Sequence, residues 1–306
     1  MARFPRALLL LLLCSFFSCS STPEGQDEIS DVRNRAAENT EFGNSYFNQA
    51  KYDQALSFFN LALTDNISVD NEEGIVQSYN SIGKVHLATG SIEAAENNFH
   101  QALSLAEKIK IPALISQSAN NLGEVFLIRL DLQKALEFFK AAFKEDDPEN
   151  PTSEYAIVLH NLGSVFKKLE DLDQSLNYFN QALAINLELK NFEEVASNYY
   201  MLASLHSKKG DYARALSQAN EALQYDKQVE NSLGIAKDLQ ALGIISVKNG
   251  ENEKAYDYFI KSYMVFQTLS LSRQTGKALQ HVIDTALLLG KNDEAERYRK
   301  LLEGKQ

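Results

Sequence analysis

The chain has 306 residues, of which 44% are hydrophobic and 23% are charged, and its formal net charge is −11. These proportions are typical of a soluble globular protein. The negative charge disfavours nucleic acids and anionic lipid headgroups as partners, because both present phosphate groups. The two cysteines are Cys14 and Cys19, so the chain beyond Cys19 has no cysteine for a disulfide or a metal site.

The first residues have the pattern of a secretory signal. Arg3 and Arg6 precede an apolar run over 7–17, which is shorter than the ~20 residues that span a bilayer as a helix. The basic start, the short apolar core and the small residues after it predict a signal peptide over 1–18. Cys19 follows directly, and the junction resembles that of bacterial lipoprotein signals, in which the cysteine becomes the lipidated first residue.

That resemblance implies lipidation of Cys19 and export to the cell envelope, on the outer membrane facing the periplasm if the source is a two-membrane bacterium. Cleavage near Ser20, which would release a soluble protein, is the alternative. Residues 19–30 are polar and contain Pro23 and Gly25, and we predict that they form a flexible tether. A lipid, rather than a basic face of the protein, would provide the membrane attachment.

Residues 118–143 contain the pattern around which the rest of the chain is organised. They predict two helices with a break at Leu130, and Asp131 is placed to cap the second helix. Small residues on both helices allow a close approach. We therefore expect Gly123 to face Ala135, with aromatic side chains filling the volume around that contact.

The same positions recur every 40 residues. The glycine position holds Gly43, Gly83, Gly123, Gly163, Ala203 and Gly243. The first alanine position holds Ala55, Ala95, Ala135, Ser175, Ala215, Ala255 and Ala295. The phenylalanine position holds Phe59, Phe99, Phe139, Phe179, Ala219 and Phe259. A fixed period in this range indicates a solenoid of stacked helix pairs.

Gly, aromatic, Ala, aromatic and Ala at offsets 0, 3, 12, 16 and 19 resemble the tetratricopeptide repeat, a helix-turn-helix unit of 34 residues. The period of 40 is similar to the variant of the family with longer helices. The resemblance implies an all-α fold, a right-handed superhelical solenoid of about seven units over 31–304. The units are predicted near 36–70, 76–110, 116–150, 156–190, 196–230 and 236–270, with a degenerate cap over 276–304 in which Arg299 replaces the phenylalanine.

The sequence contains no HExxH, P-loop, GxSxG or glycine-rich dinucleotide motif. Two of its five histidines, His86 and His206, fall in the aromatic column that a solenoid packs into its core. The acidic segment over 144–154 lacks the ligand spacing of a calcium loop and is better interpreted as a solvated loop. We therefore expect no enzyme activity, no cofactor and no metal site.

A polar column on the first helices is the best candidate for binding. The residues three before the glycine position are uncharged if His160 is neutral, and side-chain amides one repeat apart can hold the N–H and C=O groups of an extended peptide. We therefore expect these residues to be exposed; a solvated helix face without a ligand is the alternative. The predicted binding residues are Asn44, Asn80, Lys84, Asn120, Asn121, Glu124, His160, Asn161, Tyr200, Ser204 and Gln240.

A second column contains Lys168, Lys208 and Lys248. It either receives acidic side chains or a terminal carboxylate, or simply places cations at helix ends, where they suit the helix dipole. The predicted function is that of a scaffold or adaptor that binds an extended segment of a partner protein. Two alternatives are a sensory module that binds a short free peptide and a structural component of an envelope assembly.

Overall fold

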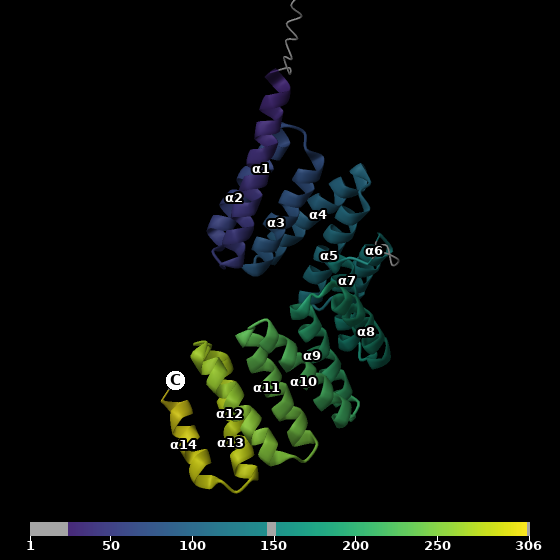
Figure 1. The fold of residues 1–306 in the computed structure, drawn as a ribbon. Helices are drawn as coiled ribbons and strands as arrows, with labels where there is room; N and C mark the ends of the chain where they lie inside the picture. Colours follow the sequence, from purple (N-terminus) through teal and green to yellow (C-terminus); the bar gives the residue numbers. More distant parts are fainter. Residues whose placement is uncertain (1–23, 146–150, 305–306) are drawn as a thin grey trace, which may run out of the picture. The chain divides into compact units, whose positions relative to one another are not determined.

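The computed structural model describes residues 24–145 and 151–304, and these residues form fourteen α-helices and no strand. The helices follow one another as pairs joined by short turns (Figure 1), which confirms the predicted all-α fold of about seven helix-turn-helix units. Within these ranges, no helix combines the length and the apolar character needed to cross a membrane. The first helices of the pairs are α1 (Glu24–Asn48), α3 (Glu72–Ala88), α5 (Pro112–Ile128), α7 (Ser153–Lys168), α9 (Phe192–Lys208), α11 (Ser232–Lys248) and α13 (Ser272–Leu288). The second helices are α2 (Tyr52–Ser68), α4 (Ile92–Ile109), α6 (Leu132–Glu145), α8 (Leu172–Leu189), α10 (Tyr212–Gln228), α12 (Asn252–Thr268) and α14 (Asn292–Glu303).

The chain divides into two compact units between Ile75 and Val76, inside α3. In the first unit, α1 packs against α2, and Arg35 donates hydrogen bonds of 3.0 and 2.6 Å to the two carboxylate oxygens of Asp65. In the second unit, each helix from α4 to α14 packs against the next one in the chain. Packing between sequence neighbours is the arrangement that a repeated sequence predicts.

Where a pair has both a glycine and a phenylalanine at these positions, the nearest side chain to the glycine is the phenylalanine ring, which the expected contact of Gly123 with Ala135 did not include. A Cβ atom placed on Gly123 would lie 2.5 Å from two ring carbons of Phe139 and 2.9 Å from a third. Phe139 and Ala135 are both fully buried. The glycine is therefore required because the aromatic ring occupies the space where its side chain would be.

In the fifth pair, the residue at the glycine position is larger and the residue at the phenylalanine position is smaller. Ala203 stands at the glycine position of α9, and Ala219 stands at the phenylalanine position of α10, and both are fully buried. A methyl group on one helix accompanies the loss of the ring on the other. In the fourth pair, Ser175 replaces alanine and satisfies its buried hydroxyl by donating a 2.7 Å hydrogen bond to the carbonyl oxygen of Gly163.

The turns within the pairs follow the sequence closely. Gly210 and Gly250 have φ values of +80°, in the left-handed region expected after the first helix. Asp131 accepts a hydrogen bond from the backbone N–H of Lys134 at 3.2 Å, which confirms its predicted role as a helix cap. Ser91 occupies the same position before α4 but makes no capping hydrogen bond through its side chain.

The helix bounds differ from the sequence-based units at the start of each pair. First helices such as α5 and α9 begin at Pro112 and Phe192, ahead of the predicted unit starts at 116 and 196. The extra residues of the 40-residue period therefore lengthen the first helix at its N-terminus. The predicted tether is also shorter than expected, because its residues 24–30 already form the start of α1.

Several predicted features lie outside the described residues. These are the signal peptide over 1–18, the lipidation site Cys19 and the central part of the acidic loop, residues 146–150. The end of that loop is described: Thr152 caps α7 by accepting a 3.1 Å hydrogen bond from the backbone N–H of Tyr155. In the last pair, Arg299 is exposed and forms a 2.7 Å ion pair with Glu296, as expected of a terminal cap that faces water.

Candidate functional site: a groove between the first helices α9 and α11

The amide column on α3 and α5 is buried, so the expectation that its members are exposed was wrong. Asn80, Asn121 and Asn120 are 2%, 3% and 8% exposed. Asn80 donates hydrogen bonds to Ser118 Oγ at 2.9 Å and to Gln117 Oε1 at 3.2 Å, and its own oxygen accepts a 3.0 Å hydrogen bond from Asn121. These amides join α3 to α5 and satisfy one another, because adjacent first helices pack together along this column.

The next junction continues the network. Asn161 of α7 donates to Asn120 Oδ1 at 3.0 Å and to Glu124 Oε1 at 3.3 Å, and Asn120 donates to the same Glu124 oxygen at 3.2 Å. Burial is the largest influence on Glu124 and raises the pKa of its carboxyl group, whereas the two amide donors and the charge of Lys84 act in the opposite direction. Glu124 therefore serves mainly as an acceptor that ties α5 to α7.

His160 connects α7 to α9 in the same way. Its Nδ1 lies 3.0 Å from Asn198 Oδ1, and its ring meets the Phe179 ring edge-on with centroids 4.9 Å apart. Asn198 uses its amide nitrogen to donate to the carbonyl oxygen of Glu194, so its oxygen faces His160 and Nδ1 carries the proton. Burial lowers the pKa of His160, which keeps the ring neutral at pH 7 and agrees with an uncharged column.

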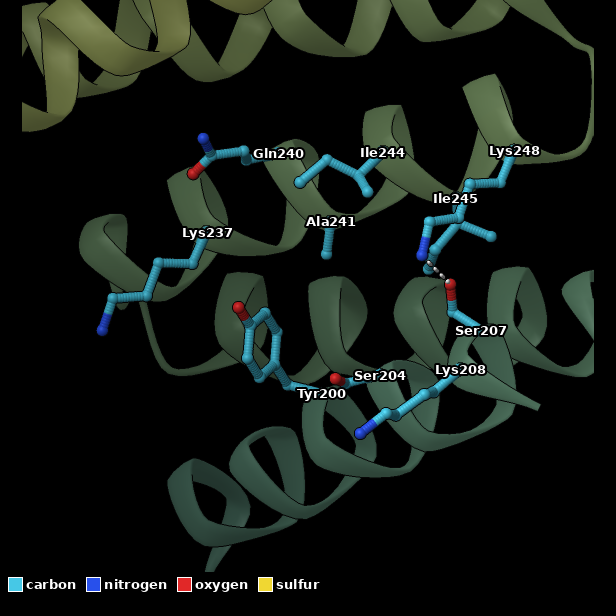
Figure 2. Close-up of a pocket in the computed structure, with 10 residues that line it drawn as sticks. All are labelled: Tyr200, Ser204, Ser207, Lys208, Lys237, Gln240, Ala241, Ile244, Ile245 and Lys248. Carbon is cyan, nitrogen blue, oxygen red and sulfur yellow. Dashed lines mark hydrogen bonds between the residues drawn. The ribbon is translucent and has the colours of Figure 1, made fainter. Parts of the chain in front are cut away.

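The remaining predicted residues are accessible. Asn44 of α1 and Lys84 of α3 are exposed, and Tyr200, Ser204 and Gln240 are partly exposed. The last three come together. They line a cavity of about 380 Å³ between α9 and α11, which Figure 2 shows with its ten lining residues. The structure thus separates the predicted set into a buried network on α3, α5 and α7 and an accessible groove further along the chain.

The groove has an apolar floor and a basic rim. Ala241 and Ile245 project from α11 toward α9 (Figure 2), and Ile244 lies beside them with 37% of its surface exposed. Three lysine side chains also line the cavity. They are Lys208 of α9 and Lys237 and Lys248 of α11.

The three ammonium groups differ in their partners. Lys208 Nζ lies 2.6 Å from Glu170 Oε1, and Lys248 Nζ donates a 3.4 Å hydrogen bond to Ser207 Oγ. Lys237 Nζ makes no ion pair or hydrogen bond with any residue that the structure describes. A cationic rim over an apolar floor suits an apolar chain that ends in, or carries, a carboxylate group.

Sequence reasoning identified Lys208 and Lys248 as part of a basic column but missed Lys237, Ala241 and Ile245. The equivalents of Lys237 one and two repeats earlier are Ser197 and Ile157, so no periodic signal marked this position. Within residues 24–145 and 151–304, no group of three or more His, Cys, Asp or Glu side chains is placed to hold a metal ion.

A stack of helix pairs whose first helices line a groove defines a helical-repeat scaffold for protein–protein interaction. The model of the tetratricopeptide repeat family matches residues 35–108, 114–188 and 154–228, which together cover more than half of the chain. The chain therefore belongs to the tetratricopeptide repeat family. A search of curated proteins found no match.

Solved structures of known proteins share this fold. The apo form of RapI is 17% identical with a TM-score of 0.72, over 88% of this chain and 76% of that one. A Rap protein complexed with competence and sporulation factor is 17% identical with a TM-score of 0.62, over 91% and 76%. PilF of Pseudomonas aeruginosa is 17% identical with a TM-score of 0.58, over 83% and 97%. At these identities the likeness concerns the fold alone.

Proposed function

We propose that this protein is an exported, lipid-anchored, non-catalytic adaptor that binds an extended segment of a partner protein along its first helices. The segment presents an acidic side chain or a terminal carboxylate to the groove between α9 and α11. Export and anchoring rest on the N-terminal pattern that ends at Cys19. The observation that carries the binding proposal is the cavity of about 380 Å³ with three lysines around an apolar floor, in a chain whose net charge is −11.

The negative net charge of the chain favours this groove over other surfaces as the site for an anionic group. In an acidic protein, a local cluster of ammonium groups concentrates the positive potential and attracts an anionic group. Among the described residues, Lys237 has no ion-pair or hydrogen-bond partner that a ligand would have to displace. Lys248 makes only a long hydrogen bond to Ser207, so both ammonium groups are available to a ligand. Lys208 already forms an ion pair with Glu170, so it would have to interact with Glu170 and the ligand at the same time.

Two double variants test the proposal. Lys237→Gln with Lys248→Gln removes two cations from the groove. Lys209→Gln with Lys254→Gln removes two cations that lie outside it and pair with Asp173 and Glu251 at 2.6 and 2.7 Å. Both changes leave the same net charge. Exposed ion pairs contribute at most about 1 kcal/mol, so we expect both variants to fold.

The assay is co-purification from detergent-solubilised membranes, followed by a titration of the recovered partner against each variant. A hydrogen bond to a charged group contributes about 1.5–3 kcal/mol, and ~1.4 kcal/mol corresponds to a tenfold change, so the groove variant should bind at least tenfold more weakly. The control variant should bind as the parent does. Equal binding by the two variants would place the interaction elsewhere.

A sensory role is the second candidate. It is favoured by the likeness in fold to the Rap protein that was solved with competence and sporulation factor. The same purification separates the two roles. A protein partner that depends on Lys237 and Lys248 supports the adaptor, whereas recovery of short peptides alone supports the sensor.

A further inference from the structure

A pair of buried carboxyl groups lies next to the groove and has no role in the basic cavity. Asp238 of α11 is 1% exposed and Asp226 of α10 is 5% exposed. Asp238 Oδ2 accepts no hydrogen bond from a described residue, and the hydrogen bond between Asp238 and Asp226 requires a proton on one of the two carboxyl groups. Both residues line a second cavity, of about 220 Å³, together with Glu193 and Tyr200 of α9. A buried carboxylate oxygen that lacks a donor and borders a cavity can accept a hydrogen bond from a ligand that enters the cavity.

Other junctions between first helices show what is missing here. The residue five before the glycine position is buried in each of them; at the α3–α5 and α7–α9 junctions it is polar and meets a donor of the preceding first helix, and at Val158 and Ala278 it is apolar. Ser118 accepts from Asn80, and Asn198 Oδ1 faces the protonated Nδ1 of His160. At the junction of α9 and α11, Asp238 occupies the repeat position of Ser118, and Tyr200 occupies that of Asn80. No hydrogen bond joins Tyr200 to Asp238 Oδ2. The junction between α9 and α11 therefore has a buried polar residue at this position but lacks the donor that the α3–α5 and α7–α9 junctions contain.

Local structure holds the second carboxyl group in place. Asn231 donates a 2.9 Å hydrogen bond to Asp226 Oδ1, and the backbone N–H of Gly234 donates a 3.1 Å hydrogen bond to Asn231 Oδ1. A side chain at Gly234 would overlap the Asp226 carboxylate, so glycine leaves the space that this carboxylate occupies. The arrangement fixes Asp226 beside Asp238 rather than allowing it to turn toward water.

Two adjacent buried carboxyl groups that form no ion pair with a described residue cannot both be ionised easily. Burial is the main cause that raises the pKa of Asp238 to about 9, followed by the charge of Asp226 and a hydrogen bond with it, while Lys237 acts in the opposite direction. Without a ligand, Asp238 is therefore protonated at pH 7. The charge of Asp238 also contributes, after burial, to a raised pKa of Tyr200.

We propose that the cavity between Asp226, Asp238 and Tyr200 binds a cationic nitrogen group, a guanidinium or an ammonium, carried by the ligand. This inference rests on the groove being the ligand-binding face proposed above. The cation donates an N–H to Asp238 Oδ2, and the carboxyl proton of Asp238 is released to solvent as the cation enters. The groups that face the site are Glu193 and Tyr200 from α9, Asp226 from α10, and Lys237 and Asp238 from α11.

The two cavities form one recognition surface with opposite charges. Tyr200 and Lys237 line both of them, so the two cavities are neighbours along the junction of α9 and α11. With a rise of about 1.5 Å per residue, Asp238 and Lys248 lie about 15 Å apart along α11, the length of about four or five residues of extended chain. A segment that fits both would carry a cationic and an anionic group at about that separation.

The test uses N-acetyl-arginine amide as a cationic probe and N-acetyl-citrulline amide as its uncharged counterpart. Carbon-13 NMR of the aspartate carboxyl groups follows the pKa of Asp238 while each probe is added to the full chain. Calorimetry in buffers of different ionisation enthalpy measures the protons released. We expect the arginine probe to lower the pKa of Asp238 and to release close to one proton per molecule bound at pH 7, and the citrulline probe to do neither.

Asp238→Asn should bind the arginine probe at least tenfold more weakly, while Glu188→Gln, a change at an exposed carboxylate on α8, should leave binding unchanged. An unchanged pKa of Asp238 with the arginine probe would show that the pair is only a structural, proton-sharing contact. That result would not contradict the proposal that the lysines bind an anionic group, because that proposal is tested separately by Lys237→Gln with Lys248→Gln. Loss of partner binding in that variant with no arginine effect would overturn this inference but not the proposed function.

Discussion

Replacing Gly123 by alanine introduces one methyl group at the closest contact between two helices. Its Cβ would lie 2.5 Å from two carbons of the Phe139 ring and 2.9 Å from a third. Phe139 is fully buried among Ala119, Ala135 and Ala142, so the ring has no free space to enter. Overpacking of this kind costs about 1–3 kcal/mol, and alanine recovers about 1 kcal/mol of helix propensity. Because three ring atoms lie within contact distance, we expect a net loss of about 1–2 kcal/mol.

Two other glycines provide a graded comparison. A Cβ on Gly163 would lie 3.0–3.1 Å from the Phe179 ring, so Gly163→Ala should lose less than Gly123→Ala. A Cβ on Gly276 of α13 would have Leu302 Cδ1 as its nearest atom at 3.7 Å. Gly276→Ala should therefore stabilise the protein by up to about 1 kcal/mol through helix propensity alone.

Urea unfolding followed by far-ultraviolet circular dichroism measures this order. Phe139→Ala alone should cost about 3–5 kcal/mol. Combined with Gly123→Ala it should cost less than the sum of the single changes, because the pair then resembles Ala203 with Ala219 in the fifth helix pair. The reasoning fails if Gly123→Ala stabilises the protein as much as Gly276→Ala does, or if the double variant is strictly additive.

The remaining predictions concern the buried network, the carboxyl pair and the N-terminus. Asn121→Ala should destabilise the protein by about 1–3 kcal/mol, since it leaves Asn80 Oδ1 without its donor; a loss below the error of urea unfolding would contradict the network. Because the pKa of Asp238 is raised to about 9, the parent should lose stability as pH rises from about 4 toward 9. Asp238→Asn should remove that loss, so its advantage over the parent should be larger at about pH 8 than at about pH 5, and an equal advantage at both would refute the shift. Cys19→Ala should release the protein from membranes or leave it unprocessed, whereas mass spectrometry of the parent showing an unmodified N-terminus beyond Cys19 would exclude lipidation.

The repeat and its internal packing follow from the sequence. Gly123 and Phe139 lie on the two helices of one pair and recur with the same spacing, so the close approach of the two helices was predicted from the sequence, although the ring that fills it was not assigned. Asp131 and Gly210 likewise marked the turns. Contacts of this kind join residues that are near in the chain, and the same contact repeats in each unit, so periodicity is sufficient to find them.

The orientation of each column relative to the neighbouring unit was decided only by the tertiary structure. Asn80, Asn120 and Asn121 have the composition of a solvated, ligand-binding face, yet the packing of first helices turns them toward the next repeat. Sequence spacing defines the side of a helix on which a residue lies, but the rotation between repeats determines whether that side meets water or another helix. The groove at Lys237 and the unpaired oxygen of Asp238 depend on that rotation and on departures from the repeat at a single junction, so no period in the sequence could mark them.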